Sequence, residues 1–234
     1  MPLTQKDPTL LNIPNLSWLP WVGSDFLLND RRLLIIGESH YAQGETLEEF
    51  KEDLKRHSDP NFTRKLILET QIQDKYKYRL LDNFWKALFT QSPNKSILWQ
   101  NIAFYNFIQR SMDYSSFDGK KTEQPNSKDF KSAWEMFGNL VKIIKPTDCI
   151  FLGLRAAEGF GNLKLRSDVS DFSYNYPNKI GHLSPVEGSF TIDGQKINVS
   201  FIQHCSSHFS PSAWQEFLHQ RHGELVKDLT RKGI

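Results

Sequence analysis

The stretch RRLLIIGESHYAQG, residues 31–44, decides the fold expected for this 234-residue chain. Four consecutive aliphatic residues run from Leu33 to Ile36 and end at a glycine. A short continuous apolar run of this kind is typical of a strand that is buried on both faces, as in a parallel sheet. A carboxylate, a hydroxyl, an imidazole and a phenol follow directly, at positions 38–41. This concentration of polar chemistry at the end of a buried strand marks a candidate site.

Outward from this strand, amphipathic and apolar segments alternate along the chain. A second buried strand is expected at 147–156, and residues 189–204 are expected to form a hairpin around Asp193-Gly194 that ends at His204. The run 97–112 fits helix, strand or a mixture of both. Helices are expected at 45–58, at 61–92 with a break near the middle, at 127–145 with Ser127 as N-cap and Pro146 just past the end, and at 210–233 with Ser210 or Ser212 as cap.

Strands that alternate with helices predict the α/β class, with three layers (α/β/α) and a largely parallel central sheet. Ligands of such sheets bind beyond the carboxyl ends of the strands. Three loops should therefore meet at one edge: GESHY (37–41), GLRA (153–156) and HCSSHFS (204–210). We expect residues 1–30 to form an arm that packs on the body, and residues 31–234 to form a single domain.

Composition narrows the class of protein further. The chain is 38% hydrophobic, with a formal net charge of +2, which permits a nucleic-acid partner without arguing for one. Only two cysteines occur, so neither a disulfide framework nor a four-cysteine metal cluster is expected. Neither a signal peptide nor an apolar run of about 20 residues, the length of a membrane helix, is apparent. The expectation is a cytoplasmic monomer with no membrane partner.

Four segments in order along the chain resemble the uracil-DNA glycosylase superfamily, over roughly residues 31–218. GESHY is similar to the family's G-Q-D-P-Y, G-[IM]-N-P-G or G-E-[AG]-P-G motif, and AFYNF is similar to its L-L-L-N segment. LVKIIKPTDCIFLGLRA matches the helix and strand that follow, and HCSSHFS stands where the family has H-P-S-P-L-S. The resemblance implies a uracil-DNA glycosylase-like fold. It also implies a DNA-repair hydrolase that flips a damaged base, uracil or another deaminated base, out of DNA and cuts its N-glycosidic bond.

The resemblance also implies roles for individual residues of the pocket. Glu38, or a water held by Ser39, would face the sugar, and His204 would donate to the pyrimidine O2 as negative charge grows there. Gly37 would form part of the floor of the base pocket. Tyr41 would crowd the C5 position and exclude thymine, and Asn106 would read the Watson–Crick edge of the base.

The last loop would hold DNA. Ser206 and Ser207, with backbone amides, would bind the phosphates that flank the base. Phe209, or less favourably His208, would push into the base stack where the family carries leucine.

Departures from the family motifs leave other functions open. Ser39 replaces the usual aspartate or asparagine, and His40 and Cys205 replace prolines. Glu38 matches the branch with an iron–sulfur cluster, but that cluster needs four cysteines, so no cofactor and no metal are expected. One alternative is an SGNH-like serine esterase with Ser39 as nucleophile and a distant histidine as base. The other is a catalytically silent binder of nucleic acid or nucleobase.

Overall fold

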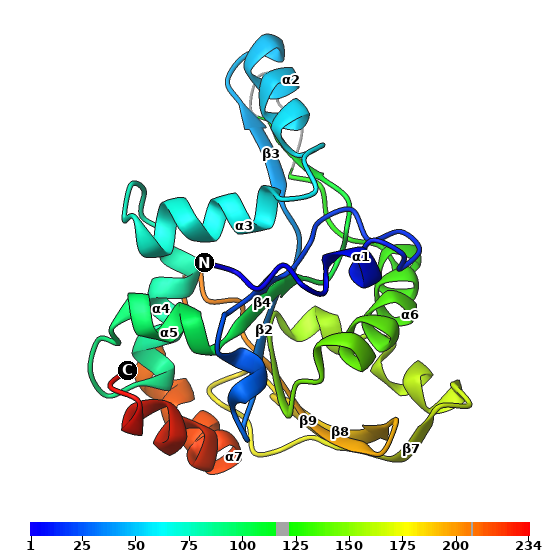
Figure 1. The fold of residues 1–234 in the computed structure, drawn as a ribbon, viewed down its shortest axis with the longest axis vertical. Helices are drawn as coiled ribbons and strands as arrows, with labels where there is room; N and C mark the ends of the chain where they lie inside the picture. Colours follow the sequence, from blue (N-terminus) through cyan, green and yellow to red (C-terminus); the bar gives the residue numbers. More distant parts are fainter. Residues whose placement is uncertain (116–121, 207) are drawn as a thin grey trace.

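A computed structural model describes residues 1–115, 122–206 and 208–234 and contains a seven-stranded mixed sheet with helices on both faces (Figure 1). Four neighbouring strands are parallel, and the three others are antiparallel to their neighbours. In sheet order the strands are β1 (Trp21–Val22), β4 (Ala103–Asn106), β2 (Leu33–Gly37), β6 (Asp148–Leu152), β9 (Gln195–Ile202), β8 (Val186–Ile192) and β7 (Val169–Asn175). The predicted α/β class with a largely parallel central sheet is confirmed.

The apolar run Leu33–Ile36 forms a strand, β2, that is buried on both faces. Every residue of β2 is buried. Leu34 and Ile36 belong to one hydrophobic cluster and Leu33 and Ile35 to another, since successive side chains of a strand point to opposite faces. The sheet therefore separates two cores.

A different set of helices covers each core (Figure 1). The cluster with Leu34 includes residues of α1 (Asp7–Leu10) and α6 (Ser127–Ile144). The other cluster is formed by helices α4 (Arg79–Leu88), α5 (Lys95–Asn101) and α7 (Pro211–Arg231). The remaining helical segments are α3 (Phe62–Ile67), a π-helical turn (Leu68–Ile72) and 3₁₀ turns at Phe26–Leu28, Leu154–Ala157 and Phe160–Leu165.

A second, two-stranded sheet projects from the body with one helix, at the top of Figure 1. It pairs β3 (Tyr41–Gly44) in parallel with β5 (Met112–Ser115), and α2 (Leu47–Arg56) packs against β3. Thr46 caps α2, accepting from the backbone N–H of Glu49 while the Glu49 side chain accepts from the cap. The helix expected at 45–58 is therefore present.

Several local expectations are refined. The 61–92 region is broken as expected, and 97–112 contains the end of α5, all of β4 and the start of β5. The N-cap of α6 is Asn126 and not Ser127, because the Asn126 side chain accepts from the N–H groups of Lys128 and Asp129. The expected arm contributes β1, which pairs antiparallel with β4, so Trp21 lies in an edge strand of the sheet.

The hairpin expected around Asp193-Gly194 joins β8 to β9. Asp193 (φ 48°) and Gly194 (φ 76°) both have positive φ, as a type I′ turn requires. β9 ends at Ile202, two residues before His204. Within the described ranges, no helix is both long and apolar enough to cross a membrane.

Candidate functional site

The four parallel strands bring their carboxyl ends to one edge of the sheet, where the expected residues follow. β4, β2, β6 and β9 are consecutive neighbours in the sheet, and Gly37 is in register with Asn106. Glu38 follows β2, Asn106 ends β4, and His204 comes two residues after β9. Three segments distant in sequence therefore supply one site, as the sequence predicted for the GESHY and HCSSHFS loops.

Gly37 and Asn106 form the floor of this site as an interlocked pair. A Cβ atom on Gly37 would lie well inside van der Waals contact with Oδ1 of Asn106, and 3.1 Å from Cζ of Phe104. Only glycine leaves room for the Asn106 carboxamide at this point. The Asn106 side chain is 1% exposed, so its amide depends on protein partners.

His40 holds that amide in place. Its Nε2 lies 2.9 Å from Nδ2 of Asn106 and 2.8 Å from Oγ1 of Thr63, on α3. Burial, and secondarily the neighbouring His57, lowers the pKa of His40 to about 3, so the ring is neutral at physiological pH. Because the Asn106 amide nitrogen can only donate, Nε2 of the neutral ring carries no proton and accepts from it, and the Thr63 hydroxyl lies beside the same lone pair. His40 is thus a buried positioning residue, and Thr63 is a member of the site that no sequence pattern indicates.

Glu38 is fixed by Tyr41 from the start of β3. The Tyr41 hydroxyl donates to Oε2 of Glu38 at 2.5 Å, and both side chains are partly buried. Burial raises the pKa of Tyr41 above its usual range, and the Glu38 carboxylate adds to the effect. The phenol therefore stays protonated and donates to one oxygen of the carboxylate. The structure thus gives Tyr41 the role of holding Glu38, and its role against C5 of a base stays a prediction.

His204 lies at the surface within electrostatic reach of Glu38. The surrounding protein atoms lower the pKa of His204 by desolvation, while the Glu38 carboxylate raises it in opposition. Its Nδ1 lies 2.8 Å from Oγ of Ser206. In the tautomer in which the Ser206 hydroxyl donates to Nδ1, the ring carries its proton on Nε2 and can donate it.

The loop that contains Ser206 is held by a side chain of α4. Asn83 on α4 donates to the carbonyl oxygens of Cys205 (2.9 Å) and Ser206 (3.2 Å). Ser207, an expected phosphate contact, lies outside the described residues.

Phe209, the expected wedge, is instead a core residue. It is 9% exposed, and its ring lies nearly parallel (16°) to that of Trp214 on α7. The apolar ring is more stable packed against this helix than exposed at the loop tip. Among the described residues of the loop, His208 is exposed, as are His204 and Ser210, and its φ of 62° turns the chain there.

Arg155, in the loop after β6, faces the same edge from the side. Its Nη2 donates to the carbonyl of Pro125 (2.8 Å) and its Nη1 to Oε1 of Gln124 (3.2 Å). It is close enough to Tyr41 to oppose the rise in the pKa of the phenol. The exposed guanidinium therefore adds positive charge beside the pocket.

Ser39 is not arranged as a nucleophile. Its hydroxyl donates to the carbonyl oxygen of Arg110 at 2.6 Å, so its proton is directed away from any histidine base. The hydroxyl ties the β2–β3 turn to the loop after β4. This geometry gives the esterase alternative no support, and it limits Ser39 to accepting a hydrogen bond from a water.

A serine, histidine and aspartate do form a hydrogen-bonded chain elsewhere, in the core. Nε2 of His222 lies 2.8 Å from Oγ of Ser200, and Nδ1 lies 3.0 Å from Oδ1 of Asp148. All three residues have 0% exposure, and His222 sits at a kink in α7 (φ −120°, ψ 20°). With no access for a substrate, this chain anchors the kinked helix to the sheet.

In the part of the chain that the structure describes, no group of three or more His, Cys, Asp or Glu side chains is placed to bind a metal ion. The strand ends thus carry a carboxylate (Glu38), an imidazole (His204) and a buried amide (Asn106) at the same edge of the sheet. No protein-family model matches the sequence, and no curated protein matches it.

Proposed function

We propose that the chain is a DNA glycosylase that hydrolyses the bond between a damaged base, uracil or another deaminated base, and deoxyribose. One observation carries the proposal. Glu38, held by Tyr41, is electrostatically coupled to His204, and Gly37 packs against Asn106 next to Glu38, although these residues lie in or just after four different strands, β2, β3, β4 and β9. The motif resemblance to the uracil-DNA glycosylase superfamily supports the same fold and reaction.

Glu38 orients the attacking water in this mechanism. Tyr41 occupies Oε2, which leaves Oε1 as the free acceptor for a water that faces C1′ of the sugar. The water oxygen bonds to C1′ as the C1′–N bond breaks, and the water proton passes to the carboxylate. The hydrogen bond from Tyr41 fixes the rotamer of Glu38 and so aims Oε1.

His204 stabilises the departing base. The electron pair of the broken C1′–N bond remains on the base, whose charge collects on a carbonyl oxygen such as O2. A neutral imidazole donates its Nε2–H to that oxygen without first losing a proton, and preorganised donation of this kind is worth about 10²–10³ in rate. The lowered pKa of His204 is consistent with that neutral donor.

Asn106 recognises the base through the part of its amide that His40 does not use. Its Nδ2 is turned toward His40, so the orientation of the carboxamide is set before a base enters. A preset amide distinguishes the Watson–Crick edges of deaminated and normal bases, because a mismatched edge leaves a buried group unpaired. His208, exposed at the loop tip, takes the wedge role proposed for this loop.

We propose DNA as the partner and a monomer as the active form. We also propose that the protein acts in the cytoplasm, where the two free cysteines, Cys149 and Cys205, are expected to stay reduced. Both thiols are buried, and neither takes part in the proposed chemistry.

An excision assay tests the proposal. Single-stranded and mismatched oligonucleotides with uracil, hypoxanthine or xanthine are incubated with the protein and then cleaved with alkali. Glu38→Gln and His204→Ala are each expected to reduce strand breaks by about 10²-fold or more, because each removes a group that acts in the transition state. Ser39→Ala is expected to retain most of the activity, since that hydroxyl already binds the Arg110 carbonyl.

Glu216→Gln is the matched control, because this carboxylate is exposed on α7. It should cleave like the unmodified protein. Breaks that persist in Glu38→Gln would refute the role of the carboxylate. Tight binding of one substrate without breaks in any protein would instead identify a silent binder.

A further inference from the structure

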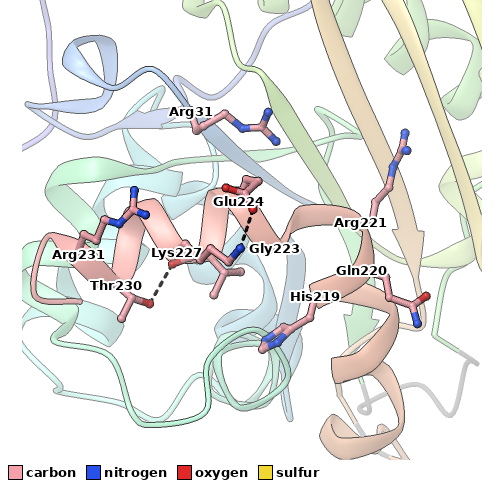
Figure 2. Close-up of a pocket in the computed structure, with 10 residues that line it drawn as sticks. Arg31, His219, Gln220, Arg221, Gly223, Glu224, Lys227, Thr230 and Arg231 are labelled. Carbon is pink, nitrogen blue, oxygen red and sulfur yellow. Dashed lines mark hydrogen bonds and ion pairs between the residues drawn. The ribbon is translucent and has the colours of Figure 1, made fainter.

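A hollow of about 620 Å³ lies beside the kink of α7, at the edge of the sheet opposite the candidate site (Figure 2). Arg31, which lines it, precedes β2, whereas Glu38 follows that strand. The other wall residues come from α7, on both sides of the kink at His222. The hollow is therefore separate from the proposed glycosylase pocket.

Cationic side chains dominate the wall of the hollow. Arg31, Arg221, Lys227 and Arg231 line it, against a single lining carboxylate, Glu224. Lys227 binds that carboxylate at 2.7 Å, as the dashed line in Figure 2 marks. The lining side chains therefore carry a net charge of +3, from four cations and one anion.

Acidic residues behind the wall hold three of these cations in position. Asp148 lies 3.1 Å from Nη2 of Arg31, and Asp228 lies 3.2 Å from Nη1 of Arg231. Glu187 lies 3.7 Å from Nε of Arg221, beyond hydrogen-bonding distance.

Two arginine donors on the wall are unfilled. Nε of Arg31 and Nε of Arg221 are buried, and among the described residues neither has a hydrogen-bond acceptor. A buried N–H without an acceptor is unfavourable, so an oxyanion that reaches these atoms stabilises the protein. Guanidinium groups present their N–H donors in a fork that matches the oxygens of phosphate.

The positions of the two arginines indicate the size of the ligand. Nη2 of Arg31 binds Asp148 on β6, and Nη2 of Arg221 donates to the carbonyl of Gly188 on β8. β9 lies between those strands, so the anchors are two strand spacings apart, about 9–10 Å. In Figure 2 Glu224 stands on α7 below Arg31, and Arg221 points up from α7 on the other side of the kink. If the guanidinium groups keep the spacing of these anchors, one phosphate ion is too short to bridge both arginines, whereas two linked phosphoryl groups are long enough.

We propose that this hollow binds a small molecule with two linked phosphoryl groups, of the inorganic or nucleoside diphosphate class. The guanidinium groups of Arg31 and Arg221, whose side chains are 33% and 27% exposed, turn so that each donates its buried Nε–H to one phosphoryl group, while Lys227 neutralises Glu224. The volume suits a nucleotide-sized ligand, since pockets for small molecules measure about 300–1,000 Å³.

Calorimetric titration with inorganic pyrophosphate tests the site. Arg221→Gln is expected to weaken binding by about tenfold or more, the effect of a lost hydrogen bond between charged groups. Arg31→Lys, which keeps the charge near Asp148 but loses Nε–H, should weaken binding similarly. The matched control is Arg56→Gln, outside the hollow, whose side chain is 65% exposed and paired with Asp53, and it should change affinity by less than about threefold.

Other outcomes overturn the proposal. Failure of the unmodified protein to bind millimolar pyrophosphate would do so, as would equal losses in Arg221→Gln and Arg56→Gln, which indicate unspecific charge attraction. A second arm uses a ten-residue oligothymidylate. If it binds in an Arg221-dependent way and pyrophosphate does not, the hollow is a nucleic-acid backbone contact. Thermal melts of each free variant separate loss of binding from loss of folding.

Discussion

Replacing Gly37 by alanine tests the floor of the candidate site directly. The added Cβ collides with Oδ1 of Asn106 and comes within 3.1 Å of the Phe104 ring. Overpacking of a tight interior costs about 1–3 kcal/mol. Displacing the Asn106 amide also breaks its hydrogen bond to His40, a further loss of about 1 kcal/mol. We therefore expect Gly37→Ala to lower the free energy of unfolding by about 2–4 kcal/mol.

Urea unfolding and thermal melting measure this loss. In a protein of this length each kcal/mol shifts Tm by about 2–4 °C, so a drop of at least about 4 °C is expected. Gly153→Ala is the matched control, at the end of the adjacent strand β6. A Cβ there meets nothing within 4 Å, so the change should stay within about 0.5 kcal/mol.

A double-mutant cycle identifies the cause. In an Asn106→Ala background the colliding carboxamide is gone, so Gly37→Ala should cost at least about 1 kcal/mol less than it does alone. Equal costs in the two backgrounds, or an unchanged Tm for Gly37→Ala, would refute the interlocked floor. In the excision assay Gly37→Ala should also lower activity, because Asn106 would lose its preset orientation.

Three further changes probe other elements. Histidine in an unfolded chain has a pKa near 6.5, whereas burial lowers the pKa of His40 to about 3 in the folded protein. Between these two pH values the unfolded chain binds one more proton than the folded protein. The free energy of unfolding therefore falls as the pH is lowered, by up to about 1.4 kcal/mol per pH unit. Urea unfolding of His40→Gln between pH 4.5 and 6 should show a shallower slope, and an identical slope would contradict this. Asn126→Ala should lower the free energy of unfolding by about 1 kcal/mol and Ser127→Ala by less than half of that, and the reverse order would restore Ser127 as the cap. Phe209→Ala should lower the free energy of unfolding by about 3 kcal/mol and His208→Ala should leave it almost unchanged. An unchanged stability of Phe209→Ala would contradict the burial of this ring.

Elements whose signals are local could be predicted from the order of residues. β2 follows from a continuous aliphatic run, and the β8–β9 turn from Asp193-Gly194, which tolerates positive φ. Alternation of strands and helices implies the largely parallel sheet, and the sheet brings GESHY and HCSSHFS to one edge. The placement of Glu38 and His204 near each other follows from that rule alone.

Side-chain partners depended on contacts between distant segments. Asn106 meets Gly37 through the register of β4 and β2, and His40 meets Thr63 because α3 packs over the β2–β3 turn. Phe209 is buried because α7 offers it Trp214, although its loop is polar. Hydrogen bonding and burial are set by neighbours in space, and the neighbours of these residues exist only once the sheet and its helices have packed.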